Sequence, residues 1–147
     1  MTKKIVFTAG TWDLFHIGHL NIIKKSKELG DYLIVGVSTD ELVMSYKKYR
    51  PFIPYDERLE IIQSIKYVDE TVKQTKLIDI NQLKKFNVDI VTIGDDWKTK
   101  YLEGLDWMKK QGKEVVYLPY TDGVSSTTIK QWIMSRSHEF EEDVSQK

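Results

Sequence analysis

The feature that most constrains the fold is a series of short apolar runs separated by segments with helical spacing. The clearest run is DYLIVGVS at residues 31–38, where apolar residues fill nearly every position. Such a run is typical of a strand that is buried on both faces, as in a parallel sheet. We expect further strands at residues 4–9, 70–72, 88–93 and 114–118.

Between these strands, apolar residues recur at the spacing of helices. We expect helices at residues 21–29, 56–65, 80–86, 101–111 and 125–133, and a basic, proline-containing loop at residues 46–55. The alternation predicts an α/β fold, a doubly wound parallel sheet with right-handed crossovers. We expect one domain at residues 1–136 and a polar, acidic tail at residues 137–147.

Composition excludes several functions. The 147 residues contain 22 Lys+Arg and 22 Asp+Glu, and this neutral balance argues against nucleic acid or a membrane as the partner. The absence of cysteine excludes disulfides and thiol chemistry. The apolar run in MTKKIVFTAG is too short for a signal peptide, so we expect a cytoplasmic protein.

The loops that follow the strands carry the chemistry. In a doubly wound sheet, ligands bind beyond the carboxyl ends of the strands, where the strand order reverses. Residues 10–19, 39–55, 94–97 and 120–128 each follow an expected strand. We therefore expect these four loops to face a single rim.

A pair of histidines stands out in the first of these loops, within TAGTWDLFHIGHL. Gly10 allows a sharp turn, and His16 and His19 are three residues apart, so they share one face near a helix start. A helix N-terminus attracts anions, two imidazoles there can donate to phosphate oxygens, and Gly18 leaves room for a nucleotide. The alternatives are ordinary surface or core histidines, or a metal site, although three histidines without cysteine offer few ligands.

The segment GTWDLFHIGHL resembles the signature of the small cytidylyltransferases, which belong to the wider HIGH-type nucleotidyltransferases. GDYLIVGVSTDE, PYDERLEIIQSIKYVDE, IGDDW and YLPYTDGVSSTTIK resemble that family's later blocks, in the same order, from residue 4 to about residue 133. The resemblance implies a Rossmann-like nucleotidyltransferase fold and in-line transfer of a nucleotidyl group from CTP to a small phosphorylated alcohol, with release of pyrophosphate. The leading acceptor is sn-glycerol 3-phosphate, and Mg²⁺ is expected, held mainly by the phosphates.

Other functions remain open beside this one. The chain can instead transfer an adenylyl group from ATP to a phosphorylated cofactor precursor, or use a different phosphorylated acceptor with CTP. A third alternative is a nucleotide-binding protein without catalysis. IGDDW favours CTP over ATP. As relatives often do, the chain is expected to form a homodimer, with exposed apolar residues in 46–55 and 61–67 as the seam.

The resemblance also assigns roles to residues. His16 and His19 would stabilise the α-phosphate and the departing pyrophosphate, and Lys47 (or Lys48, in the other register) would bridge the donor and acceptor phosphates. Arg58 and Lys66 would bind the acceptor, unless Arg58 pairs with Asp56 or Glu57. Nucleotide binding is expected of Gly10, Thr11, Trp12, Asp13, His16, Gly18, His19, Gly94, Asp95, Asp96, Tyr120, Ser125, Ser126 and Thr127.

For several of these residues, a structural role is the alternative. Asp13 either positions its loop or helps to hold the metal–phosphate complex. Asp95 and Asp96 fit an ordinary turn, and one hydroxyl of residues 125–127 is enough for a helix cap.

The chain also departs from the family pattern. Tyr120 replaces an arginine in PYTDG, Lys66 replaces an arginine in IKYVDE, and Lys130 stands where related adenylyltransferases carry arginine. These changes affect the choice of base and acceptor more than the chemistry of transfer.

Overall fold

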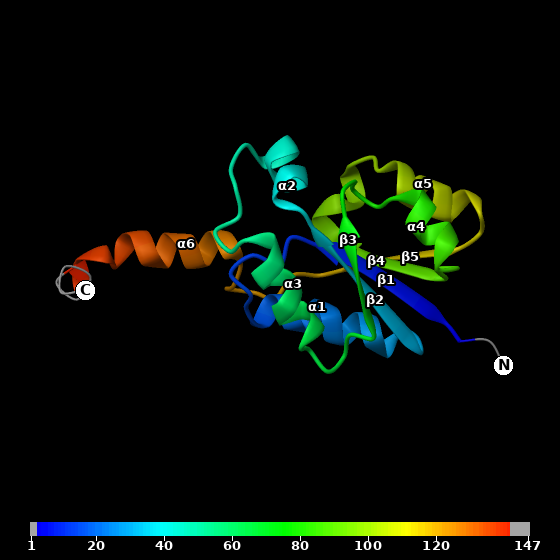
Figure 1. The fold of residues 1–147 in the computed structure, drawn as a ribbon, viewed down its shortest axis with the longest axis horizontal. Coiled ribbons are helices and arrows are strands. Elements are labelled where there is room, and N and C mark those ends of the chain that lie inside the picture. Colours follow the sequence, from blue (N-terminus) through cyan, green and yellow to red (C-terminus); the bar gives the residue numbers. More distant parts are fainter. Residues whose placement is uncertain (1–2, 142–147) are drawn as a thin grey trace.

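The computed structural model describes residues 3–141 and contains a five-stranded parallel sheet with the order β3-β2-β1-β4-β5 (Figure 1). The strands are β1 (Ile5–Gly10), β2 (Tyr32–Ser38), β3 (Glu70–Gln74), β4 (Ile90–Gly94) and β5 (Glu114–Leu118). The helices are α1 (Ile17–Glu28), α2 (Asp40–Lys47), α3 (Tyr55–Gln63), α4 (Ile80–Lys85), α5 (Glu103–Lys110) and α6 (Ser126–Ser135), with the 3-10 turns η1 (Asp95–Thr99) and η2 (Ser137–Glu139).

Helices cover both faces of the sheet, as predicted. On one face, Ile23 of α1 and Ile62 of α3 are fully buried against β1 and β2. On the other face, Leu83 of α4 and Met108 of α5 are fully buried against β1, β2 and β4 (Figure 1). Strand β2 is buried at six consecutive positions, which explains its continuous apolar sequence. The doubly wound α/β fold is therefore confirmed.

The predicted strands and helices agree with the structure to within a few residues, with two exceptions. Helix α1 begins at Ile17, four residues earlier than expected. Helix α2 was not predicted, and its last residues fall in the expected loop. Thr39 caps α2 by accepting from the Leu42 N–H at 3.1 Å, and Lys48, in the left-handed conformation with φ 65°, ends it.

The loops at the carboxyl ends of the strands frame the site. Strand β1 lies at the centre of the sheet, where the chain reverses its direction of winding, so the β1–α1 loop lies at the switch point. Two residues of this loop, Trp12 with φ 59° and Leu14 with φ 52°, adopt the left-handed conformation without being glycine. Strained backbone of this kind is concentrated at functional sites.

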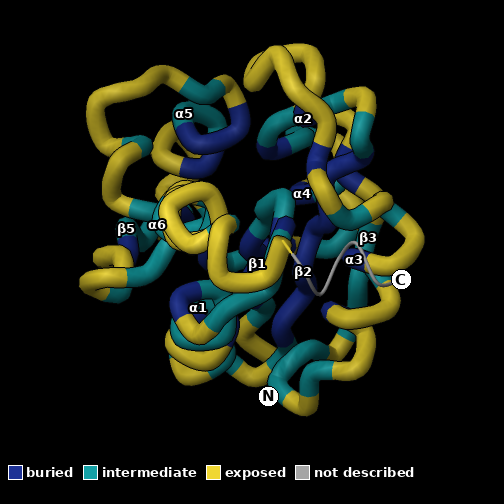
Figure 2. Tube along the Cα trace, turned by 90° about the vertical axis from the view of Figure 1, so that its left-hand side faces the viewer, coloured by how far each residue is buried: buried dark blue, intermediate teal, exposed yellow. Residues whose placement is uncertain are grey.

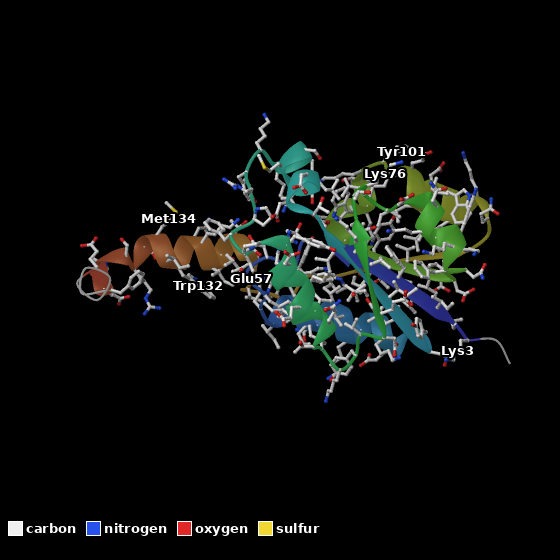
Figure 3. The ribbon with its side chains drawn as sticks, viewed as in Figure 1. Lys3, Glu57, Lys76, Tyr101, Trp132 and Met134 are labelled. Carbon is white, nitrogen blue, oxygen red and sulfur yellow. The ribbon has the colours of Figure 1, made fainter. Side chains whose placement is uncertain are left out.

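Helix α6 projects away from the body of the molecule (Figure 1). It contains no buried residue, and its outer surface is exposed throughout (Figure 2). Trp132 and Met134 lie on opposite sides of the helix (Figure 3) and are 49% and 77% exposed. In the tail expected at residues 137–147, the structure shows the 3-10 turn η2. Residues 142–147 lie outside the described residues. In residues 3–141, no helix has the length and apolar character needed to cross a membrane.

Candidate active site

The histidine pair opens helix α1 and forms its cap. His16 is the N-cap, and its Nδ1 accepts from the Gly18 N–H at 3.0 Å, while the His16 N–H donates to Nδ1 of His19 at 3.3 Å. This reciprocal arrangement is a capping box with two imidazoles in place of the usual hydroxyl and carboxylate. The rings stack with centroids 3.8 Å apart. Histidine is not among the usual N-cap residues. The sequence therefore gave no sign that α1 begins at Ile17, directly after this cap.

The same contacts fix which ring nitrogen carries the proton. Because Nδ1 accepts a hydrogen bond in both rings, each neutral imidazole is protonated at Nε2. Nε2 of His16 is buried and has no partner among residues 3–141. A buried donor without an acceptor is costly, so a ligand oxygen at this position would stabilise the arrangement.

Both rings are uncharged at neutral pH. Burial, together with the charges of His16 and Lys47, lowers the pKa of His19 to about 3. Burial also lowers the pKa of His16. The pair therefore offers two N–H donors and no positive charge of its own.

Lys47 lies close enough to act on His19. It is the last residue of α2 and is exposed, and its charge contributes to the low pKa of the His19 ring. The structure thus brings Lys47 and the histidine pair to the same rim, as expected. Lys48 follows it as the cap of α2.

Asp13 connects three segments of the rim. Its carboxylate accepts from the N–H groups of Phe52 and Ile53, both at 2.9 Å, and its carbonyl oxygen accepts from Ser126 Oγ at 3.0 Å. Asp13 is only 6% exposed. Of its two expected roles, the geometry supports positioning of the loop. Among residues 3–141, no group of three or more potential ligand side chains forms a metal site.

The start of α6 faces the start of α1. Ser125 is the N-cap of α6, and its Oγ accepts from the Thr128 N–H at 3.0 Å. A Cβ atom on Gly18 would lie 3.4 Å from Val124, so the two helix starts are adjacent. Asn21, a residue that was not predicted, adds a 2.9 Å hydrogen bond from its Nδ2 to Thr121 Oγ1.

The hydroxyls that open α6 are thus partly used within the protein. Ser125 caps the helix, Ser126 binds Asp13, and Thr127 is exposed. The N–H groups of Ser126 and Thr127 lie in the first turn, where no intrahelical partner exists. This first turn can therefore bind phosphate oxygens through its backbone.

Two further predicted residues meet at the ends of β4 and β5. Tyr120 Oη donates to the Asp96 carboxylate at 2.7 Å, and burial together with this bond raises the pKa of Tyr120. A Cβ atom on Gly94 would lie 2.6 Å from Tyr120 Oη, so the tyrosine hydroxyl lies close over the Gly94 backbone. Asp95 is exposed at the start of η1.

The Trp12 side chain has a structural role. It is 5% exposed, and its Nε1 donates to the carbonyl of Gly36 at 2.9 Å. Its ring lies against Gly10 and meets the His19 ring edge-on, with centroids 5.5 Å apart. The Trp12 side chain therefore packs in the core and supports His19, and nucleotide binding at Trp12 stays a prediction. The carbonyl oxygen of Thr11 also faces the interior, where it accepts a hydrogen bond from Arg58.

Arg58 is likewise buried, with no exposed surface. It donates to the carbonyl oxygens of Ile53, Thr11 and Ser38 at 2.8, 2.6 and 2.8 Å and pairs with Asp40 at 2.6 Å. This corrects both expectations for Arg58, because it faces the protein and its carboxylate partner lies on α2. Its burial results from packing between loops, which sequence spacing does not report.

Lys66 lies away from the histidine pair, between α3 and β3. Helix α3 starts at the rim and runs back along the sheet, so Lys66, which lies beyond its end, precedes β3 at the opposite edge. Its Nζ lies 5.3 Å from the neighbouring Tyr67 ring. The expectation that Lys66 binds the acceptor does not fit this position.

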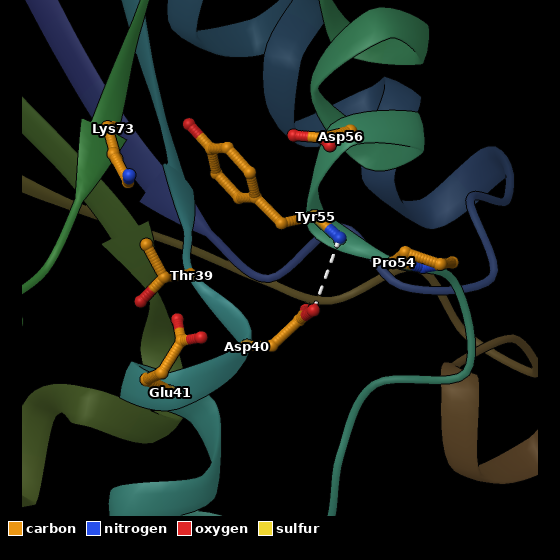
Figure 4. A pocket seen from close by; sticks show the side chains of 7 residues that line it. All are labelled: Thr39, Asp40, Glu41, Pro54, Tyr55, Asp56 and Lys73. Carbon is orange, nitrogen blue, oxygen red and sulfur yellow. Dashed lines mark hydrogen bonds between the residues drawn. The ribbon is translucent and has the colours of Figure 1, made fainter.

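A separate hollow of about 240 Å³ opens beside β2 and β3 (Figure 4). It is lined by Thr39, Asp40, Glu41, Pro54, Tyr55, Asp56 and Lys73. Three carboxylates and one ammonium group repel a phosphate overall. The rim beside the histidine pair is therefore the better site for a phosphorylated ligand.

Comparisons with known proteins show which family the chain resembles. The cytidylyltransferase-like family model matches residues 7–132. Glycerol-3-phosphate cytidylyltransferase of Bacillus subtilis (strain 168) is 41% identical over 131 residues, which cover 88% of this chain and 97% of the relative. FAD synthase of Thermococcus kodakarensis is 37% identical over 139 residues, covering 90% and 93%.

A solved structure supports the same fold. The lipopolysaccharide core biosynthesis protein of Thermoplasma volcanium GSS1 matches with a TM-score of 0.66 and 27% identity, covering 82% of this chain and 98% of that one. The resemblance found in the sequence is therefore confirmed over most of the chain.

Proposed function

The chain belongs to the cytidylyltransferase-like family, and we propose that it transfers a cytidylyl group from CTP to a small phosphorylated alcohol. Our first candidate acceptor is sn-glycerol 3-phosphate, which would give CDP-glycerol and pyrophosphate. The observation that carries this proposal is the buried, unpartnered Nε2–H of His16 beside the His19 ring. Together they form a preorganised pair of donors for phosphate oxygen.

In the proposed reaction, an oxygen of the acceptor phosphate attacks the α-phosphorus as the bond from that phosphorus to the pyrophosphate oxygen breaks. The attacking oxygen is already anionic, so no general base is required, and positioning and charge stabilisation provide the catalysis. His16 and His19 would donate to oxygens that gain negative charge. Because both rings are neutral, they stabilise the transition state without holding the product as a cation would.

The positive charge would come from Lys47 and from the metal ion of the substrate. We treat Mg²⁺ as part of MgCTP, since the described side chains form no cluster for it and the Asp13 carboxylate is engaged with the loop. Bound to the phosphates, the ion neutralises charge on the pyrophosphate. Lys47 would bridge the donor and acceptor phosphates, and the first turn of α6 would hold the β- and γ-phosphates.

A screen for pyrophosphate release tests the proposal. CTP and ATP would each be offered with glycerol 3-phosphate and a panel of other alcohol phosphates, and the products identified by mass spectrometry. We expect release with CTP, with glycerol 3-phosphate among the accepted partners. Tight CTP binding without release for any acceptor would contradict it.

Adenylyl transfer is the second candidate, and the similarity to the FAD synthase of Thermococcus kodakarensis favours it. That relative is 37% identical, nearly as similar as the cytidylyltransferase. An ATP-dependent product with a phosphorylated cofactor precursor, in place of a CTP-dependent one, would decide for this candidate.

Lys47→Ala tests whether Lys47 bridges the donor and acceptor phosphates or only adds positive charge to the surface. We expect a rise of about tenfold in the acceptor KM together with slower turnover, because a bond to a charged group is lost. Lys76→Ala, which removes an exposed lysine on the β3–α4 connection, is the control. An unchanged acceptor KM and rate in Lys47→Ala would exclude the bridging role.

We further propose a cytoplasmic homodimer. Exposed apolar side chains occur in both predicted seam segments, among them Phe52 at 65% and Ile61 at 42%. Helix α6 adds Trp132, Ile133 and Met134, all about half exposed or more. Sedimentation equilibrium tests the dimer, and a monomer at all concentrations would contradict it.

A further inference from the structure

We propose that Lys130 is a positioning residue that holds the loop of residues 48–54 against helix α6. Lys130 Nζ lies 4.5 Å from the Tyr49 ring centroid and 5.2 Å from the Phe52 ring centroid. It also donates to Tyr49 Oη at 3.4 Å. We call this contact of Lys130, Tyr49 and Phe52 the aromatic clasp. The inference rests on the proposed function, which gives the loop its task.

The exposure of the two rings supports the clasp. Tyr49 is 45% and Phe52 is 65% exposed, so burial does not explain their place in the loop. A cation between two aromatic faces gains electrostatic energy from both of them. The long stem of Lys130 reaches from α6 to the loop, where its partner Tyr49 lies 81 residues earlier in the sequence.

The loop of residues 48–54 is held by contacts on two sides. On the inner side, the Asp13 carboxylate holds the N–H groups of Phe52 and Ile53. On the outer side, the clasp joins the loop to α6. Because α6 is otherwise unburied, the clasp also restrains the direction in which this helix leaves the site.

The clasp links the two substrates. Lys47, the proposed bridging lysine, immediately precedes the loop, whereas the first turn of α6, proposed to bind the triphosphate, lies one turn before Lys130. A contact between α6 and the loop therefore sets the distance between the nucleotide and Lys47. This predicts an effect of Lys130 on the acceptor through the loop and no direct bond from Lys130 to phosphate.

Amide hydrogen exchange of the full chain tests the clasp without any substrate. We expect Lys130→Met to accelerate exchange in residues 49–53 by about two- to fivefold, the range for the loss of an exposed cation–π contact. Lys130→Arg should restore protection, because guanidinium also stacks on aromatic rings. Tyr49→Leu should reproduce Lys130→Met, and the double variant should exceed neither single variant.

Kinetics give the second readout. We expect the acceptor KM of Lys130→Met to rise about fivefold while the CTP KM changes by less than about twofold. Lys109→Met is the matched control, because Lys109 Nζ lies 5.4 Å from the Tyr117 ring and 3.0 Å from its Oη on another face of the molecule. This control should change neither exchange in residues 49–53 nor KM.

Two results would overturn the clasp. Unchanged exchange in Lys130→Met, with a raised CTP KM, would make Lys130 a direct phosphate ligand. Additive effects of Lys130→Met and Tyr49→Leu would show that the two side chains act separately. Since exchange is measured without substrate, it judges the clasp even if no cytidylyl transfer is found.

Discussion

The starts of helices α1 and α6, which lie next to each other, are built in opposite ways. Helix α1 is anchored in the core by Ile23 and Ser26, and its histidine cap is backed by the buried Trp12 ring. Helix α6 has no buried residue and is held at its start by single contacts such as Ser126 to Asp13. The difference teaches that the proposed histidine donors are fixed by the fold, whereas the proposed triphosphate site at α6 depends on a few surface contacts.

His16→Asn tests the fixed side and should have the largest effect. Asparagine is a good N-cap, so α1 should keep its start, but the buried Nε2–H is lost. We expect kcat to fall by about 100- to 1000-fold, as for other preorganised donors, with little change in the CTP KM.

The control for this variant is His138→Asn, which alters an exposed histidine in η2. Pyrophosphate release at saturating CTP gives kcat. A raised CTP KM with an unchanged kcat would show that His16 binds the ground state only, and the contrast between the two walls would then fail.

Ser126→Ala tests the loosely held side and should have an intermediate effect. The variant removes the 3.0 Å bond that joins the start of α6 to the Asp13 carbonyl. We expect the CTP KM to rise about fivefold, in the range for one lost hydrogen bond, and kcat to change by less than about twofold.

Ser135→Ala is the matched control, since that hydroxyl bonds within the far end of α6. Isothermal titration with CTP provides a check that does not depend on turnover. A loss of kcat at unchanged KM would place Ser126 among the transition-state donors and remove the distinction from α1.

The pH dependence of unfolding tests how firmly the cap of α1 is buried. Of the expected effects, this one should be the smallest. Folding lowers the pKa of His19 to about 3, from 6.5 in the unfolded chain. Between these values the unfolded state binds more protons, so the stability present above pH 6.5 is lost as the pH falls. We expect the loss from His19 to be about 1 kcal/mol between pH 7 and pH 5, since partial exposure weakens the full linkage value.

His19→Gln removes this titration and keeps the cap, because glutamine is a usual third-position partner in a capping box. Urea unfolding at pH 5 and pH 7 should therefore show a smaller difference in His19→Gln than in the natural chain. Equal differences in the two proteins would mean that His19 is solvated and that the wall around it is less rigid than its contacts indicate.

Most of the fold was predictable from the sequence, because continuous apolar runs such as that of β2 report burial on both faces. Helix α2 was not predicted, although Thr39 followed by two acidic residues is a usual helix start. Its sequence, DELVMSYK, has a weak apolar stripe and leaves only Val43 buried. Local spacing is a poor signal for such a short, exposed helix.

Within the site, the sequence placed His16, His19 and the hydroxyls of α6 on one rim, because loops after parallel strands share an edge. It did not separate residues that touch a ligand from residues that support them. Trp12 and Arg58 lie within or next to the family's motifs, yet both are buried and bonded to backbone carbonyls. Such roles depend on packing between distant loops, which only the folded chain reveals.

The buried guanidinium of Arg58 bears on any attempt to redirect this protein to other acceptors. Removing one partner of a buried charged pair costs about 3–5 kcal/mol, so a mutant library randomised at position 58 would consist mostly of chains that fail to fold. Diversity is better placed at Tyr46, whose exposed side chain lies next to Lys47. Directed evolution of acceptor choice would then act on the surface and leave the scaffold intact.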